Sequence, residues 1–182
     1  MLGLKSNELR IVPYDDKWKD YFEAEKILIK EKLKDHFELD NFTIYHIGST
    51  SIPRISSKPI IDMMLVSKKF ELYSSKISFL LNFLGYEQVS WDLNNECIFL
   101  VKGRDEDREV ITHHIHIVSS QSRKYEEYLL FKNFLTKNYK YAQIYKRRKI
   151  ELVSIYPNDR GEYRKAKGVI VNKVLKIAEL TL

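Results

Sequence analysis

Three groups of residues in this chain have types and spacings that suit phosphate or metal chemistry. The first lies in segment 46–62, which reads His-Ile-Gly-Ser-Thr-Ser-Ile-Pro-Arg-Ile-Ser-Ser-Lys-Pro-Ile-Ile-Asp. Gly48 allows a tight turn that a phosphate can approach closely, and the hydroxyls of Ser49 and Thr50 suit an anion. Asp62 falls in an apolar run typical of a buried strand, where a lone carboxylate needs a divalent metal or hydrogen-bond donors. The alternative is an ordinary loop and a carboxylate bonded to a neighbouring turn.

The second group is a set of histidines on a strand expected over 112–118. Because successive side chains on a strand alternate faces, His114 and His116 share one face and His113 lies on the other. Two imidazoles at this spacing can bind a metal through neutral nitrogens, or donate to a phosphate when protonated. The alternative is that these histidines are partly buried and bonded to backbone carbonyls.

The third group consists of basic residues in the C-terminal third. Lys146 and Lys149 are three residues apart, as are Arg164 and Lys167, so each pair shares one side of a helix. Together with Lys58, such side chains can neutralise the charge of a triphosphate. The alternative is that they form ordinary solvated helix faces.

Length and composition indicate a globular protein. A chain of 182 residues, 44% apolar and 31% charged, is expected to form one domain over 1–182. We expect a sheet-containing core over 1–120 and a helical extension over 121–182. No apolar run approaches the ~20 residues of a membrane span, and no secretory signal pattern is visible. Cys97 is the only cysteine, which fits a reducing compartment, so a cytoplasmic location is expected.

The charge is concentrated toward the end of the chain. Residues 121–182 hold 15 Lys and Arg against 6 Asp and Glu, whereas the whole chain carries a formal charge of +6. Such a bias serves polyphosphate or nucleic acid, and solubility alone also produces basic helices. RNA is the weaker of the two partners, because no strand with paired aromatic residues and no zinc-finger spacing is present.

Hydrophobic periodicity predicts alternating helices and strands, which indicates an α/β fold. Helices are expected over 14–35 and 70–84, and strands over 42–47, 60–66, 86–91, 97–102 and 112–118. Asn94 and Asn95 suit a turn within a hairpin, and the charged run 103–109 is typical of a solvated loop. From residue 122 the pattern is helical with an interruption near 157–161, which predicts three C-terminal helices.

The order of these groups resembles the GrpB family of nucleotidyltransferase-like proteins, also found as a C-terminal domain of some bacterial dephospho-CoA kinases. The resemblance covers nearly the whole chain. Its most specific part is the segment from His46 to Asp62, followed by the His113-His114-Ile115-His116 run. Supporting motifs are Val12-Pro13-Tyr14-Asp15 with Trp18, Leu130-Phe131-Lys132-Asn133-Phe134-Leu135, Tyr141-Ala142 with Tyr145-Lys146, and Tyr163 with Ala166-Lys167.

The resemblance implies an α+β nucleotidyltransferase fold with a mixed sheet, an N-terminal helix and a C-terminal helical subdomain. It also implies a turn that holds nucleotide phosphates and strand carboxylates that bind magnesium. Two features depart from that pattern. Met64 stands where the wider superfamily carries a second carboxylate, and Arg54 stands where many relatives have glycine, so that it either binds phosphate or alters the turn.

Two hypotheses about function follow. In the first, the protein is a nucleotidyltransferase that binds a nucleoside triphosphate with Mg²⁺ or Mn²⁺. Gly48 and Ser49, with Thr50, seat the phosphates, Asp62 and His116 hold the metal, with His114 as the other candidate, and the residues that neutralise charge are Lys58, Lys146 and Lys167. In the second, the same fold is a non-catalytic module that binds a nucleotide or a CoA-related metabolite, or supports a kinase partner. Met64 favours the second.

Overall fold

The computed structural model describes residues 2–5, 8–91, 97–103 and 110–181. Its strands are β1 (Leu4–Lys5), β2 (Phe42–Ile47), β3 (Ile61–Ser67), β4 (Tyr86–Trp91), β5 (Cys97–Lys102), β6 (Val110–Ile111) and β7 (His113–Ser119). Its helices are α1 (Lys17–Leu33), α2 (Phe70–Asn82), α3 (Arg123–Lys137), α4 (Tyr139–Ile155) and α5 (Arg160–Glu179), with 3₁₀ turns at Leu39–Asn41 and Ser49–Ser51. The predicted turn at Asn94 and Asn95 and residues 104–109 of the predicted loop lie outside the described residues.

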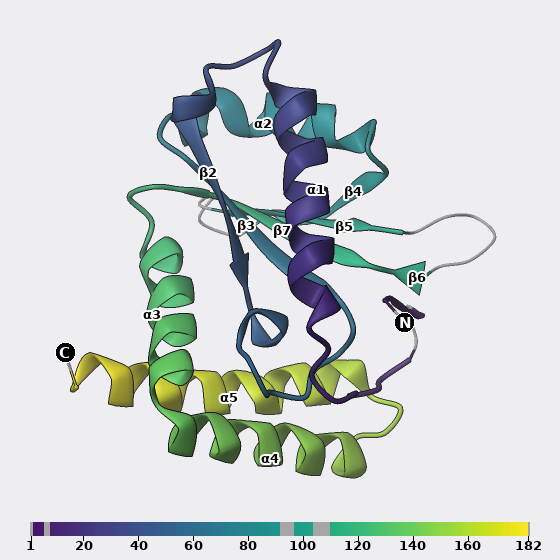
Figure 1. The fold of residues 1–182 in the computed structure, drawn as a ribbon, viewed down its shortest axis with the longest axis vertical. Coiled ribbons are helices and arrows are strands. Elements are labelled where there is room, and N and C mark those ends of the chain that lie inside the picture. Colours follow the sequence, from purple (N-terminus) through teal and green to yellow (C-terminus); the bar gives the residue numbers. More distant parts are fainter. Residues whose placement is uncertain (1, 6–7, 92–96, 104–109, 182) are drawn as a thin grey trace.

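The centre of the fold is a five-stranded sheet with the order β2-β3-β7-β5-β4 (Figure 1). β3 and β7 run parallel, and the other neighbouring pairs are antiparallel. This confirms the expected mixed sheet, the N-terminal helix and the three C-terminal helices. The register pairs Asp62 with His114 and Met64 with His116, so these residues lie on neighbouring strands.

One face of the sheet packs against α1 and α2, which lie over it in Figure 1. The helices contribute Trp18, Phe22 and Ile77, while Met63 and Ile115 face them from β3 and β7. These side chains are 5% exposed or less, so this interface forms the main hydrophobic core. Since side chains alternate along a strand, Asp62 and His114 must lie on the opposite face.

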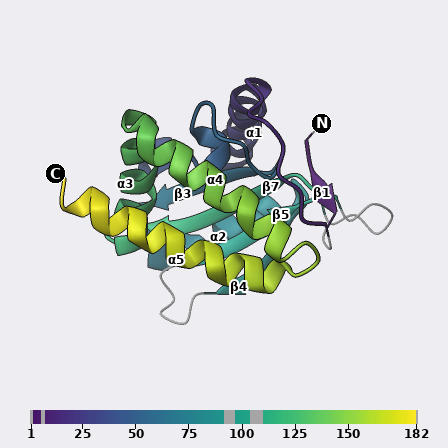
Figure 2. The same ribbon diagram turned by 90° about the horizontal axis from the view of Figure 1, so that it is seen from below.

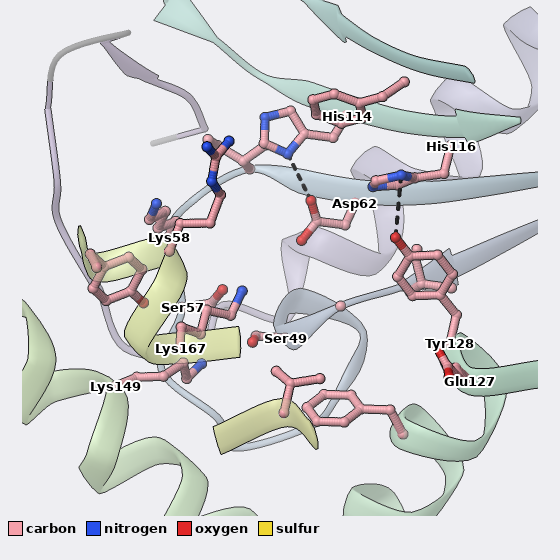
Figure 3. Close-up of a pocket in the computed structure, with 18 of the residues that line it drawn as sticks. Ser49, Ser57, Lys58, Asp62, His114, His116, Glu127, Tyr128, Lys149 and Lys167 are labelled. Carbon is pink, nitrogen blue, oxygen red and sulfur yellow. Dashed lines mark hydrogen bonds and ion pairs between the residues drawn. The ribbon is translucent and has the colours of Figure 1, made fainter. Parts of the chain in front are cut away.

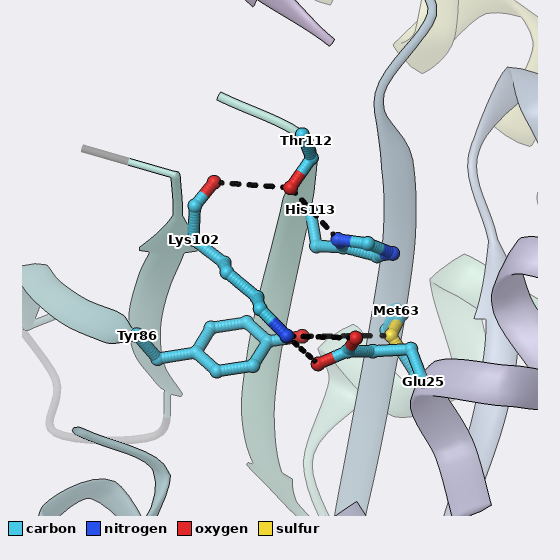
Figure 4. A network of polar contacts seen from close by, with 6 residues as sticks. All are labelled: Glu25, Met63, Tyr86, Lys102, Thr112 and His113. Carbon is cyan, nitrogen blue, oxygen red and sulfur yellow. Dashed lines mark hydrogen bonds and ion pairs between the residues drawn. The ribbon is translucent and has the colours of Figure 1, made fainter. Parts of the chain in front are cut away.

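A buried polar network ties α1 to the same core face (Figure 4). Lys102 Nζ donates to both carboxylate oxygens of Glu25 at 2.8 Å, and Tyr86 Oη contacts Met63 Sδ at 3.9 Å. His113 lies beside them, and its Nδ1 is 2.9 Å from Thr112 Oγ1. Because Glu25 is only 5% exposed, its pairing with Lys102 satisfies a charge that would otherwise be costly to bury.

Helices α3, α4 and α5 pack against one another beside the other face of the sheet (Figure 2). Their shared core includes Phe131, Leu135 and Leu175, together with Ile52 and Ile55 from the segment after β2. This packing attaches the helical subdomain to the turn that follows β2. No helix in the described part of the chain combines the length and the apolar character that crossing a bilayer requires.

A second sheet was not predicted. It consists of β1 and β6, in which Leu4 pairs with Ile111 and Lys5 with Val110. Each strand has only two residues, which is too short for an alternation of apolar and polar side chains to be visible in the sequence.

The structure shows the backbone conformation at Arg54, where the sequence left open whether this residue alters the turn. Its φ is 67°, and it is the one non-glycine residue with positive φ in the described part of the chain. Its side chain is exposed. The turn therefore keeps a backbone conformation suited to glycine, the residue expected there from the family resemblance, although an L-residue pays about 1–2 kcal/mol to adopt it.

Replacing Arg54 with glycine is expected to raise the free energy of unfolding by up to about 1 kcal/mol. Relief of the left-handed strain, roughly 1–2 kcal/mol, outweighs the roughly 0.4–1 kcal/mol of added chain entropy in the unfolded state. Urea denaturation measures the change. Arg54→Ala is the matched control, because it removes the same charge but keeps Cβ. An equal gain in both variants would show that the side chain, and not the backbone, sets the penalty.

Candidate functional site

A cavity of about 910 Å³ lies between the sheet and the three C-terminal helices. Figure 3 shows that side chains from the sheet, from the segment 48–58 and from the helices all point into it. Its volume falls in the range of roughly 300–1,000 Å³ found for small-molecule sites. Residues that line it include Gly48, Ser49, Ser57, Lys58, Asp62, Phe99, His114, His116, Glu127, Tyr128, Tyr145, Lys149, Arg160, Arg164 and Lys167.

Gly48 and Asp62 are in direct contact at the centre of this cavity. Gly48 follows β2, has a φ of 68°, and lies so close to β3 that an added Cβ would overlap the Asp62 carboxylate and stand 2.9 Å from Asp62 Cβ. Glycine is required there for both its backbone angles and its lack of a side chain. The predicted meeting of the turn and the carboxylate is thus present.

The carboxylate of Asp62 is bonded to His114. The Nδ1–H of His114 donates to Asp62 Oδ1 at 2.9 Å. Burial alone would raise the pKa of Asp62. The hydrogen bond and the charge of His114, with the charge of Lys167, have the larger effect and lower this pKa to about 2. Asp62 is therefore ionised at neutral pH.

His116 has different partners. Its Nδ1 lies 3.3 Å from Tyr128 Oη and 3.8 Å from Cys97 Sγ, and its ring stacks on Phe99 with centroids 4.7 Å apart. Burial lowers the pKa of His116 to about 4, so the ring is neutral at pH 7. His116 is held among aromatic side chains and is bonded to neutral groups, not to Asp62.

The turn after Gly48 is closed by its own side chains and by α4. Ser51 Oγ donates to the carbonyl of Gly48 at 2.7 Å, and Ser49 Oγ lies 3.2 Å from Tyr145 Oη. Interaction with the Tyr145 phenol raises the pKa of Lys167, which keeps that ammonium group charged. A chain of polar contacts therefore runs from the turn through Tyr145 to α5.

Cationic side chains dominate one side of the cavity. Lys149 is 2% exposed and donates to the carbonyl of Ser56 at 2.7 Å. Burial, followed by the charges of Arg160 and Lys167, lowers the pKa of Lys58 to about 7, and burial lowers that of Lys149 as well. Among the residues that the structure describes, no carboxylate forms an ion pair with Lys58, Lys149 or Lys167.

The cavity brings together most of the residues predicted to bind phosphate or metal. Those that line it are Gly48, Ser49, Lys58, Asp62, His114, His116 and Lys167. Thr50 and Lys146 are not part of the lining. Thr50 is 1% exposed, and its Oγ1 lies 3.0 Å from His46 Nε2, so it holds the turn from behind. On α4 the lysine that faces the cavity is Lys149, one turn beyond Lys146.

The sequence reasoning missed the aromatic lining of the site, which comes from Phe99 and Tyr128. Phe99 is paired in register with His116 across β5 and β7, and it therefore shares the histidine's face. Alternation along the predicted strand 97–102 indicates which of its side chains share a face with Phe99. Placing Phe99 beside the histidines also requires knowing that this strand pairs with the histidine strand.

The side chains at Asp62 were tested for their fit to the predicted Mg²⁺ or Mn²⁺. Such ions prefer several oxygen ligands in near-octahedral geometry. Asp62 offers one carboxylate that already accepts from His114, and Met64 is fully buried in an apolar cluster. In residues 2–5, 8–91, 97–103 and 110–181, no three His, Cys, Asp or Glu are grouped to hold a metal. The protein alone therefore offers fewer oxygen ligands than such an ion prefers.

Comparison of structures defines the class of fold. The Cid1 poly(U) polymerase in its MgATP-bound crystal structure is similar with a TM-score of 0.55 at 10% sequence identity. The match covers 78% of this chain and 43% of the Cid1 chain. The mixed sheet with its helical cover is therefore a nucleotidyltransferase-like fold.

The chain belongs to the GrpB protein family, whose model matches residues 8–177. The crystal structure of GrpB from Enterococcus faecalis has a TM-score of 0.80 at 29% identity, covering 93% of this chain and 96% of that one. The glutamate-rich protein GrpB of Alkalihalophilus pseudofirmus is 29% identical over 96% of this chain and 98% of its own. The UPF0157 protein PA4798 of Pseudomonas aeruginosa is 30% identical over 93% of this chain and 67% of its own.

Substitution of Gly48 by alanine tests the close approach of the turn to Asp62. We expect a loss of roughly 2–4 kcal/mol in the free energy of unfolding, from left-handed strain and from overlap with the carboxylate. Gly85→Ala is the matched control, because Gly85 has a φ of 82° but only Lys102 Cγ, at 4.0 Å, near its missing Cβ. That variant should lose about 1 kcal/mol. Equal losses in chemical denaturation would contradict the close approach.

Proposed function

We propose that this protein binds a small molecule carrying a polyphosphate, of the nucleotide class, in the cavity beside Asp62, and that it does so without a divalent metal. The observation that carries the proposal is the excess of cations over carboxylates in the lining. Lys58, Lys149 and Lys167 face a cavity in which Asp62 is bonded to His114. A bound polyanion would supply the missing negative charge.

The depressed pKa of Lys58 supports this function. Its ammonium group is destabilised by burial and by the neighbouring cations Arg160 and Lys167. Placing like charges together in a partly desolvated cavity is unfavourable in the absence of a ligand, and structures keep such perturbed groups mainly at functional sites. Phosphate oxygens would turn that repulsion into charge-assisted hydrogen bonds.

The fold supports a nucleotide in particular, because the Cid1 structures that it resembles contain MgATP or a UTP analogue. Metal-dependent nucleotidyl transfer is the second candidate, and the location of Asp62 on a strand beside the turn favours it. The buried Met64 and the bond between Asp62 and His114 favour binding alone. RNA is less favoured, since the cations lie inside a cavity and not along an open groove.

Isothermal titration calorimetry with ATP and with inorganic tripolyphosphate in EDTA tests the proposal. Lys167→Met is expected to weaken both affinities by about tenfold or more, because a hydrogen bond to a charged group contributes roughly 1.5–3 kcal/mol. Lys146→Met is the matched control, since Lys146 also lies in this basic region but outside the cavity. It should bind as wild type does.

The same titration with Mg²⁺ or Mn²⁺ separates the two candidates. An affinity that is the same in EDTA and with the metal supports the proposal. An equal affinity of Asp62→Asn and the wild-type protein also supports it. Affinity that appears only with metal and is lost in Asp62→Asn would contradict it and support nucleotidyl transfer. Absence of binding by wild-type protein to either compound would also contradict it.

Affinity for ATP is expected to fall as the pH rises from 7.5 to 9. With a pKa lowered to about 7, Lys58 is charged below pH 7 and loses its proton above it. A bound polyanion favours the charged form, so binding takes up a proton in this window and weakens as protons become scarce. Calorimetry in buffers of different ionisation enthalpy measures the uptake. Lys58→Met should reduce the uptake, and an unchanged pH profile in that variant would contradict the assignment.

A further inference from the structure

The cavity has two chemically different ends (Figure 3). Lys58, Lys149 and Lys167 lie on one side of Asp62, and His116 and Tyr128 lie on the other. The proposed phosphate site accounts for the first end only. A polyphosphate alone would leave the second end of the cavity unfilled.

The second end is bounded by a continuous row of four rings. His114 meets Phe99 edge to face at 5.2 Å, Phe99 stacks on His116 at 4.7 Å and 27°, and His116 is 5.1 Å from Tyr128 at 45°. All four side chains line the cavity. The row begins at the partner of Asp62 and ends on α3, so it runs away from the cationic side.

Hydrogen bonds hold this row in place. Asp62 orients the ring of His114, while Tyr128 Oη and Cys97 Sγ lie within hydrogen-bonding distance of His116 Nδ1. Because burial lowers the pKa of His116 to about 4, the ring is neutral and offers no charge to a phosphate. The row is therefore suited to contact with an uncharged aromatic surface.

We propose that the ring row formed by His114, Phe99, His116 and Tyr128 is a subsite for a planar heteroaromatic group covalently joined to the polyphosphate. This inference rests on the proposed function and adds the place where the ring of such a ligand binds. Stacking on aromatic side chains contributes roughly 1–3 kcal/mol per base and tolerates different bases, because every base has a π-face. The subsite is thus expected to select for a ring over an alkyl chain, with little preference among bases.

A polar group at this end suits the edge of such a ring. Glu127 lines the cavity from α3 beside Tyr128 (Figure 3). Its carboxylate can accept from an exocyclic amine or a ring N–H. Glu127 also accepts from Arg123 Nε at 2.7 Å, so one of its oxygens is already engaged and its position is restrained.

The test compares four probes by calorimetry in EDTA: inorganic tripolyphosphate, ATP, UTP and hexyl triphosphate. Wild-type protein is expected to bind ATP and UTP at least tenfold more tightly than tripolyphosphate or the hexyl compound, since one stacked base contributes roughly 1–3 kcal/mol. Phe99→Leu should remove most of that advantage and leave the affinity for tripolyphosphate unchanged. Phe99→Tyr, which keeps the ring, should retain the advantage.

Phe79→Leu is the control for the loss of a phenylalanine elsewhere, because Phe79 lies on α2 and is 64% exposed. It should match wild type with all four probes. Circular dichroism and the midpoint of urea unfolding establish that each variant is folded. If Phe99→Leu fails to fold, Tyr128→Leu and Tyr128→Phe provide the same comparison from the other end of the row.

Two results would overturn the ring subsite and leave the phosphate site standing. One is equal affinity of wild-type protein for tripolyphosphate and for the two nucleotides. The other is hexyl triphosphate binding as tightly as ATP, which would define an apolar subsite without ring selectivity. If the wild-type protein binds neither tripolyphosphate nor the nucleotides, the proposed function on which the inference rests is itself wrong.

Discussion

The site depends on the contact between the backbone of Gly48 and the carboxylate of Asp62. The two residues are brought together by the antiparallel pairing of β2 with β3, and glycine alone leaves room for the carboxylate. His114, from the other neighbouring strand, then donates to the same carboxylate. With His114 as donor and Gly48 as neighbour, Asp62 is fixed in position and ionised. The rest of the cavity is arranged around this carboxylate.

Charge balance around Asp62 connects the fold to the proposed function. Residues 121–182, which include the C-terminal helices, hold 15 Lys and Arg against 6 Asp and Glu, and packing against Ile52 and Ile55 directs some of this charge toward the sheet. The lining holds two carboxylates, Asp62 and Glu127, which are outnumbered by basic side chains that include Lys58, Lys149 and Lys167. Burial, followed by repulsion from Arg160 and Lys167, lowers the pKa of Lys58. A polyanionic ligand resolves this imbalance more directly than a divalent cation, which would add positive charge.

Much of this arrangement follows from patterns in the sequence. Alternation along one strand placed His114 and His116 on the same face, whereas their position beside Asp62 required the pairing of two strands, which the register shows. Helical spacing was less informative, because Lys146 and Lys149 share a side of α4 and only packing against Ser56 distinguishes the buried lysine. Which lysine is buried depends on contacts between segments that are distant in sequence, and local periodicity does not encode such contacts.

Two further features could not be predicted from the sequence for the same reason. The hydroxyl of Thr50 turns away from the cavity because His46, stacked on Phe22 of α1, offers it a buried partner. The ring row requires the pairing of Phe99 with His116, which is a property of the assembled sheet. The family resemblance supplied the fold, but it did not indicate that His114 would be the hydrogen-bond partner of Asp62.

A crystal structure of the protein with ATP and Mn²⁺ tests the central claim most directly, since anomalous scattering locates manganese independently of the phosphates. Our account predicts phosphates beside Lys58 and Lys167, the bond between Asp62 and His114 intact, and no manganese on Asp62. Manganese coordinated by Asp62, with His114 displaced from the carboxylate, would contradict it.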